Sequence, residues 1–187
     1  MPTETITKLA AAERQLNEAI RLFFERRDIV AVHTLAAASD QVLSNLCVAK
    51  GIKPRLRGYA DFIRAEVRKE WFGHLTHAEN FFKHAERDPE GALEFNTEQT
   101  TWVLSSATML YGELTKKLTH EASVFFCWFF LKKPGYLRDG PFKQSLMNLC
   151  DSTKVSADDF AFFSRLITYG RGLAPRWFTF PGGVRGT

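Results

Sequence analysis

Residues 28–51, with the sequence DIVAVHTLAAASDQVLSNLCVAKG, have the pattern of one complete amphipathic helix. Asp28 precedes the first apolar residues, and an aspartate there caps a helix by accepting hydrogen bonds from free backbone N–H groups. Gly51 follows Lys50, and glycine commonly ends a helix because it adopts the left-handed conformation. Between these signals, apolar and small residues recur every three or four positions. They predict one buried stripe made of Val32, Leu35, Ala36, Ser39, Val42, Leu43 and Leu46.

The segments on both sides of this helix also have helical patterns, and none alternates with the period of two that marks a strand. A first helix is expected to run to about Arg27, with Thr3 or Thr5 as its cap. Residues 59–87 are compatible with helix until Pro89 ends the pattern, and two helices could meet at Gly73. Later helices are expected from capping patterns at Asn96 with Gln99, at Thr119, and at Ser156 with Asp159, and over Pro141–Leu149. The fold class is therefore all-α, a bundle of five or more helices.

Residues 170–187 have a different composition from the rest of the chain. They contain five glycines, two prolines and three arginines together with Trp177, Phe178 and Phe180, so neither helix nor strand is expected. The predicted organisation is a helical bundle over residues 1–169 and an irregular tail over 170–187. Because a cluster of exposed aromatic side chains is unfavourable, Trp177 and Phe178 are expected to pack onto the bundle or onto a second subunit.

The composition predicts one aromatic-rich globular domain. The chain has 187 residues, including 17 phenylalanines and 4 tryptophans, and a mild net charge of +4. The run FFCWFF at 125–130 is expected in the core, with an oligomer interface as the alternative. Three cysteines without a close pair predict neither a disulfide framework nor a zinc site. The chain shows no signal-peptide pattern and no apolar run near the ~20 residues that span a bilayer, so we expect a cytoplasmic protein outside membranes.

Residues 70–88, EWFGHLTHAENFFKHAERD, contain three of the five histidines of the chain. Because a helix turns about 100° per residue, Glu70, His74 and His77 would share one helix face. This spacing can bring oxygen and nitrogen ligands to one metal ion, as in helical bundles that bind iron or manganese, with His33 as a candidate further ligand. The alternative is a solvated helix face without a metal.

Asn80 and His84 form a second candidate constellation in the same segment. They lie one helical turn apart, so their amide and imidazole groups could hydrogen-bond to each other. Such a pair can hold a phosphate or position a base for RNA cleavage, and Asn80 and His84 are the candidate catalytic residues. The alternative is a local bond between two side chains on a helix surface.

These features resemble the HEPN helical domain, the nucleotide-binding domain named for higher eukaryotes and prokaryotes. The resemblance rests on the alanine-rich stretch ERRDIVAVHTLAAASDQVLSNLCVAKGI at 25–52 and on NFFKHAERD at 80–88, and it covers residues 8–118. The longer segment NFFKHAERDP is similar to bacterial proteins of unassigned function. Ribonucleases of the HEPN family use an Arg, usually followed by a polar residue, and a His. The resemblance assigns the polar residue to Asn80 and the His to His84.

The chain departs from that family motif at one position. Glu79 occupies the place of the Arg, and a carboxylate has the wrong sign and no donors for binding phosphate. Arg68 and His74 offer an alternative pair of similar spacing in a different sequence context. The resemblance therefore implies the fold more than the activity, and many HEPN domains are non-catalytic.

A short basic segment is the candidate nucleic-acid-binding region. Lys53, Arg55 and Arg57 follow Lys50 without an intervening acid, and Arg68 lies further along the chain. Such a cluster could bind the phosphates of RNA. The alternative is a solvated loop, since acidic residues soon dilute the charge.

The sequence favours a non-catalytic HEPN-like binding protein whose partner is RNA or another protein and which forms a homo-oligomer. The alternatives are a divergent HEPN-type ribonuclease that uses His84, and a metal-dependent oxidase built on the face of His74, His77 and His84. The sequence identifies no ligand, cofactor or pathway.

Overall fold

The computed structural model describes residues 3–52, 68–86, 88–136 and 140–170. Within these ranges the chain forms seven α-helices, one short 3-10 helix and no strand. The elements are α1 (Lys8–Phe24), α2 (Ile29–Ala49), α4 (Arg68–Lys83), α5 (Glu98–Thr115), α6 (His120–Lys132), η3 (Pro134–Tyr136), α7 (Pro141–Thr153) and α8 (Phe160–Tyr169). The expected all-α bundle of five or more helices is confirmed. Of the predicted tail, residues 171–187 lie outside the described residues.

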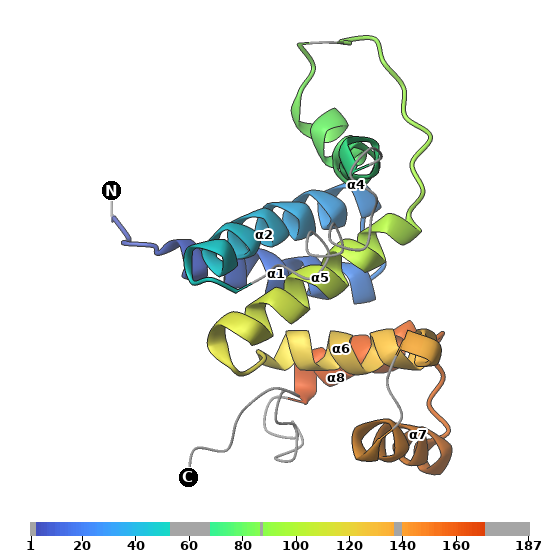
Figure 1. The fold of residues 1–187 in the computed structure, drawn as a ribbon. Helices are drawn as coiled ribbons and strands as arrows, with labels where there is room; N and C mark the ends of the chain where they lie inside the picture. Colours follow the sequence, from blue (N-terminus) through green and yellow to red (C-terminus); the bar gives the residue numbers. More distant parts are fainter. Residues whose placement is uncertain (1–2, 53–67, 87, 137–139, 171–187) are drawn as a thin grey trace.

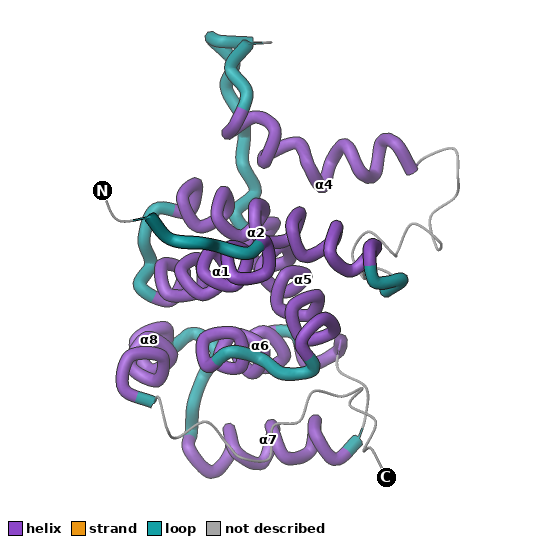
Figure 2. The backbone as a smooth tube through the Cα atoms, turned by 90° about the vertical axis from the view of Figure 1, so that its left-hand side faces the viewer, coloured by secondary structure: helices purple, strands orange, loops and turns teal. Residues whose placement is uncertain are grey.

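The helices stack in layers around α1, α2 and α5 (Figure 1). Helix α2 packs extensively against both α1 and α5, and α6 and α8 cover the opposite side of α1. Helix α4 lies beyond α2 at one end of the stack, and α7 lies beyond α6 at the other end, as Figure 2 also shows. Among the described elements, these two outermost helices are therefore attached to the bundle mainly through one neighbour each.

Several helix ends follow the sequence signals. Asp28 Oδ1 accepts hydrogen bonds from the backbone N–H groups of Val30 and Ala31, each at 3.0 Å, and so caps α2. Gly51 has a φ of 69°, the left-handed conformation expected after the helix end. Thr119 Oγ1 caps α6 by accepting a bond from the Ala122 N–H at 3.1 Å. These caps confirm the predicted ends of α2 and start of α6.

Other predicted boundaries are wrong. Thr7, rather than Thr3 or Thr5, caps α1, since its hydroxyl accepts the Ala10 N–H at 3.1 Å. The capping box predicted at Asn96 does not form, because the Asn96 side chain accepts the N–H of Glu98 and α5 begins after Thr97.

Two further corrections concern α8 and α4. Asp159 caps α8 in place of Ser156, through a bond of 2.9 Å from the Phe162 N–H. Helix α4 continues through Gly73 instead of breaking there, and it ends at Lys83.

The core between α1, α6 and α8 is a cluster of aromatic rings. Phe24 is 2% exposed, and its ring centroid lies 5.6 Å from that of Trp128 and 5.4 Å from that of Phe163. Phe125 is fully buried, and the Trp128 indole donates a hydrogen bond to the Ala157 carbonyl at 2.8 Å. The run at 125–130 is buried apart from the half-buried Cys127. The predicted location of this run in the core is confirmed.

Buried and partly buried polar contacts fix the helices around α1 relative to one another. The Ser39 hydroxyl of α2 donates to the Ala12 carbonyl of α1 at 2.8 Å. The Tyr111 hydroxyl of α5 donates to the Glu13 carboxylate at 2.5 Å. Because a buried polar group without a partner is costly, such bonds select one arrangement of the helices over others with equal apolar burial.

Candidate functional site

Helix α4 brings the candidate metal ligands onto one helix. Glu70, His74 and His77 all lie within its continuous helical span, as the sequence pattern requires. The side chains of Glu70 and His74 lie outside the described part of the structure, whereas His77 is exposed. Among the described side chains, no group of three His, Cys, Asp or Glu residues has the arrangement of a metal site. The candidate metal site at Glu70, His74 and His77 stays a prediction.

The candidate catalytic pair lies at the end of α4. His84 follows the last helical residue, and its backbone N–H bonds to the Asn80 carbonyl at 3.0 Å, so the two residues lie one turn apart. Both side chains are exposed and described, and they form no hydrogen bond with each other. The His84 imidazole Nδ1 lies 3.3 Å from the Glu86 carboxylate instead. An exposed imidazole paired with a neighbouring carboxylate lacks the enclosure in which a general base is usually tuned.

Glu79, at the position of the family Arg, forms an ion pair on the same helix. Its carboxylate lies 2.5 Å from the Lys83 ammonium, one turn further along α4, and only 14% of its side chain is exposed. The pair is of the stabilising i,i+4 type, with Glu preceding Lys. The carboxylate is therefore held by a cation of its own helix.

His33 of α2 lies under α4 and is 1% exposed. Its Nδ1 lies 3.1 Å from the Thr100 hydroxyl of α5, and its ring centroid lies 5.8 Å from Phe82 of α4 and 5.0 Å from Phe95. Burial lowers the pKa of His33, with Glu79 acting against that shift and Lys83 adding to it. Because the described surroundings of His33 are aromatic rings and a hydroxyl, His33 is a packed core residue and the expectation of a metal ligand at this position is not supported.

The candidate nucleic-acid-binding residues fall largely outside the described ranges. This applies to Lys53, Arg55 and Arg57 and to the side chain of Arg68, whose backbone begins α4. Among the described residues, seven basic side chains form ion pairs with carboxylates. They are Arg14 with Glu4, Arg21 with Glu18 and Glu121, Arg27 with Glu25, Lys83 with Glu79, Lys116 with Glu113, Lys132 with Asp158 and Lys133 with Glu98.

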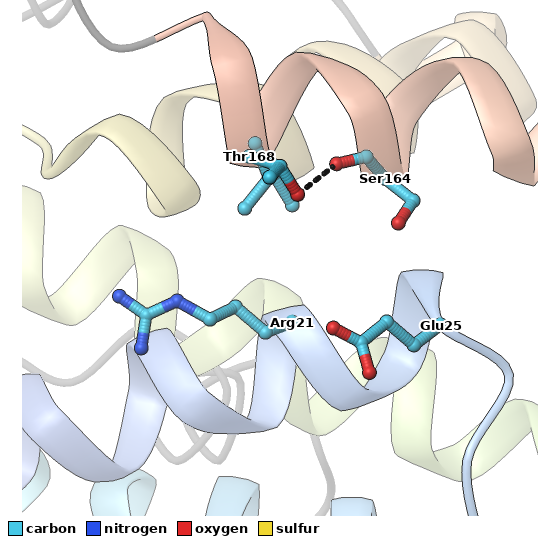
Figure 3. A pocket seen from close by; sticks show the side chains of 5 residues that line it. Arg21, Glu25, Ser164 and Thr168 are labelled. Atoms are coloured by element: carbon cyan, nitrogen blue, oxygen red, sulfur yellow. Dashed lines mark hydrogen bonds between the residues drawn. The ribbon is translucent and has the colours of Figure 1, made fainter.

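A cleft of about 250 Å³ lies between α1 and α8 (Figure 3). Arg21 of α1 and Glu25, the C-cap residue of α1, face Ser164 and Thr168 of α8 across it, and Ile167 completes the lining. Its described lining contains no imidazole or thiol. The cleft therefore presents a guanidinium, a carboxylate and hydroxyls, which can form hydrogen bonds to a polar ligand.

Arg21, the cation of this cleft, is already neutralised. Its guanidinium lies 2.6 Å from the Glu121 carboxylate, which is 5% exposed, and 3.1 Å from that of Glu18. Burial works against the charge of Arg21, but the bonds to both carboxylates outweigh that effect and raise its pKa. Arg21 therefore holds α1 against α6 and has little capacity left for an anionic ligand.

The cleft continues into a wider and shallower groove at the start of α8. The two share Glu25 and Ser164, and the groove has a volume of about 810 Å³. The Arg26 guanidinium lies 4.8 Å from the centre of the Phe160 ring, and Asp158 is bound to Lys132 at 2.8 Å. Sequence reasoning missed this groove because its walls come from opposite ends of the chain and carry no shared motif.

Comparisons with models of protein families, with curated proteins and with solved structures found no match to this chain. In the described part of the chain, no helix has the length and apolar character needed to cross a membrane.

Proposed function

We propose that this chain is a non-catalytic, HEPN-like helical interaction module whose partner is another protein. The observation that supports this proposal most is the ion pair between Glu79 and Lys83. In the HEPN ribonucleases that this chain resembles, catalysis depends on an arginine at the position that Glu79 occupies here. A carboxylate there, held by its own lysine at 2.5 Å, neither binds phosphate nor leaves the neighbouring cation free to do so.

The environment of Asn80 and His84 also favours binding over catalysis. His77, Asn80 and His84 are exposed along one side of the end of α4, where amide and imidazole groups can bond to another molecule. Non-obligate protein interfaces use polar groups of this kind around their apolar contacts. We therefore assign the partner-binding surface to these three side chains.

Charge pairing favours a protein partner over RNA. Binding to a nucleic acid draws on cations that are free to replace counterions along the phosphates. Seven basic side chains of the described residues are paired with carboxylates, which weakens their attraction for phosphate. RNA is the second candidate partner because Lys50, Lys53, Arg55 and Arg57 form a dense basic segment.

The catalytic alternative is tested by RNA cleavage. Purified full-length chain and its His84→Ala variant are incubated with labelled single-stranded RNA, and we expect the same background rate for both. Cleavage that His84→Ala abolishes, with an unchanged circular-dichroism spectrum, would overturn the proposal in favour of the ribonuclease. A Glu79→Arg variant that gains cleavage would show that Glu79 alone separates this chain from catalytic relatives.

The binding proposal is tested by capture and identification of a partner. The full chain, an α4 variant with His77, Asn80 and His84 all changed to Ala, and a control variant are used to capture partners from the native cells. The control changes the exposed, hydrogen-bonded pair Gln41 and Asn45 of α2 to Ala. We expect a defined protein to bind the full chain and the control directly, and to bind the α4 variant at least tenfold more weakly.

A second binding assay separates RNA from protein as the partner. Fluorescence anisotropy measures single-stranded RNA binding to the full chain and to a variant with Lys53, Arg55 and Arg57 changed to Glu. Micromolar or tighter RNA affinity at physiological salt that this variant loses would replace the protein partner with RNA.

Elemental analysis of protein purified without a histidine tag tests the metal-dependent oxidase, and stoichiometric iron or manganese lost in a His74→Ala/His77→Ala variant would support it.

A further inference from the structure

Among the described residues, helix α4 is held on the bundle mainly by its packing against α2. It packs mainly against α2 and extends away from the remaining helices (Figures 1 and 2). Its contact surface includes Ala78, which is 2% exposed, and Phe82, whose ring meets the ring of His33 at an interplanar angle of 85°. His33 therefore lies at the point where α4 is held.

The His33 ring is arranged for the neutral form of imidazole. Its Nδ1 has Thr100 as a hydrogen-bond partner, whereas its Nε2 is buried and has none. A neutral imidazole has a single N–H group, and with that group at Nδ1 it can donate to the Thr100 hydroxyl. The unprotonated Nε2 is then only an acceptor without a partner. Protonation would place a second N–H donor and a full charge among the rings of Phe82 and Phe95, where no described group accepts that hydrogen bond.

The charged groups near His33 do not compensate for protonation. Glu79 and Lys83, both on α4, act on His33 with opposite signs and are bound to each other at 2.5 Å. Helix α5 presents the neutral Thr100, and the segment before α5 presents Phe95. Desolvation therefore has the largest influence on the pKa of His33, and it lowers that pKa, which favours the uncharged ring.

The least costly response to protonation is movement of α4. Helix α2 is packed extensively on both α1 and α5, so withdrawing His33 itself would break the centre of the bundle. Displacing α4 with Phe82 would open one side of His33 to water at the cost of the packing between α2 and α4 and of the contact between the Phe82 and Phe95 rings, whose centroids lie 5.2 Å apart. The segments that open at low free energy in proteins are those with few buried contacts of this kind.

We propose that His33 is a pH-sensitive latch that holds α4 on α2 while neutral and releases α4 when protonated. The proposal does not depend on which partner the bundle binds. When α4 is released, the pKa of His33 returns toward its ordinary value of 6.5, whereas burial beneath docked α4 lowers that pKa. The docked state is therefore fully favoured above about pH 6.5, and the ratio of docked to released α4 falls by up to about tenfold for each pH unit below it.

Hydrogen–deuterium exchange tests the latch. Protection of α4 and α1 amides is measured from pH 7.5 to 5.5 and corrected for the intrinsic pH dependence of exchange. In the unmodified chain we expect α4 protection to fall by up to tenfold per pH unit below 6.5 while α1 protection is retained. His33→Gln should remove this fall, and His77→Gln, which changes an exposed histidine of α4, should keep it.

A titration of the unmodified chain makes the test independent of any variant. NMR chemical shifts should give His33 a midpoint below its ordinary value of 6.5. Constant α4 protection across the pH range, the same fall in His33→Gln, or equal losses in α1 and α4 would each overturn the proposal. A His33 midpoint at or above 6.5 would overturn it as well.

Discussion

Replacing Phe24 with Ala should be among the most damaging single changes in this protein. Phe24 is 2% exposed, and its ring lies within 5.3–6.3 Å of the rings of Phe23, Phe125, Trp128, Phe160 and Phe163. The variant loses the transfer free energy of the ring and leaves a cavity between α1, α6 and α8, which together cost about 3–5 kcal/mol. The loss should therefore reduce the stability of the whole bundle.

Urea denaturation followed by circular dichroism at 222 nm measures this cost. With a slope of about 2–3 kcal/mol/M, a loss of about 3–5 kcal/mol lowers the unfolding midpoint by about 1–2.5 M. Val48→Ala is the matched control, because Val48 is 63% exposed and its truncation should change stability by less than about 0.5 kcal/mol. A midpoint for Phe24→Ala that equals the control would refute the assignment of this cluster as the core.

A double-mutant cycle isolates the contact between α1 and α8. The Phe24 and Phe163 rings are stacked, with centroids 5.4 Å apart and planes at 25°. Such a pair contributes about 0.5–1.5 kcal/mol beyond its buried area, so Phe24→Ala and Phe163→Ala should be non-additive by that amount. Additivity within about 0.3 kcal/mol would mean that the stacked pair has no specific role.

Two further perturbations test the α1–α5 contact and the end of the chain. Tyr111→Phe removes the donor to Glu13 and should cost about 1–3 kcal/mol near neutral pH. Because burial, followed by the bond to Glu13, raises the pKa of Tyr111, the unfolded chain ionises first, and the unmodified protein should lose this advantage as pH rises above its ordinary value of 10.0. Urea midpoints between pH 8 and 11 should converge, and a constant difference would contradict the argument. Truncation after Gly170 should lower the melting temperature or dissociate an oligomer in light scattering, and an unchanged melting temperature and mass would show that residues 171–187 support neither.

The sequence predicted those features that depend on residues close together in the chain. The caps at Asp28 and Thr119 and the stop at Gly51 are local hydrogen-bonding and backbone choices, so their residues carry the signal directly. Thr7 was missed in favour of Thr3 or Thr5 because all three have the same chemistry. The three threonines differ only in their distance from the start of the buried stripe of α1.

The features that the sequence did not predict depend on packing between distant segments. The predicted stripe of α2 omitted His33, Ala37, Ser44 and Cys47, which are buried because α2 contacts α4 and α5 as well as α1. Small side chains on several faces allow that close approach, but they also occur on exposed helix surfaces. The cleft around Arg21 exists only once α8 has docked on α1, so no periodicity in either segment predicts it.

The docking of α8 on α1 links the first and the last of the described helices during synthesis. Phe24 and Phe163 are separated by roughly 140 residues, which a ribosome takes about 7–28 s to add at 5–20 residues per second. Through that interval the aromatic rings of α1 lack the partners that α8 later supplies, and exposed aromatic surface of this kind promotes association between nascent chains. Yield in the cell should therefore depend on translation rate and chaperone supply more than the stability of the finished bundle would indicate.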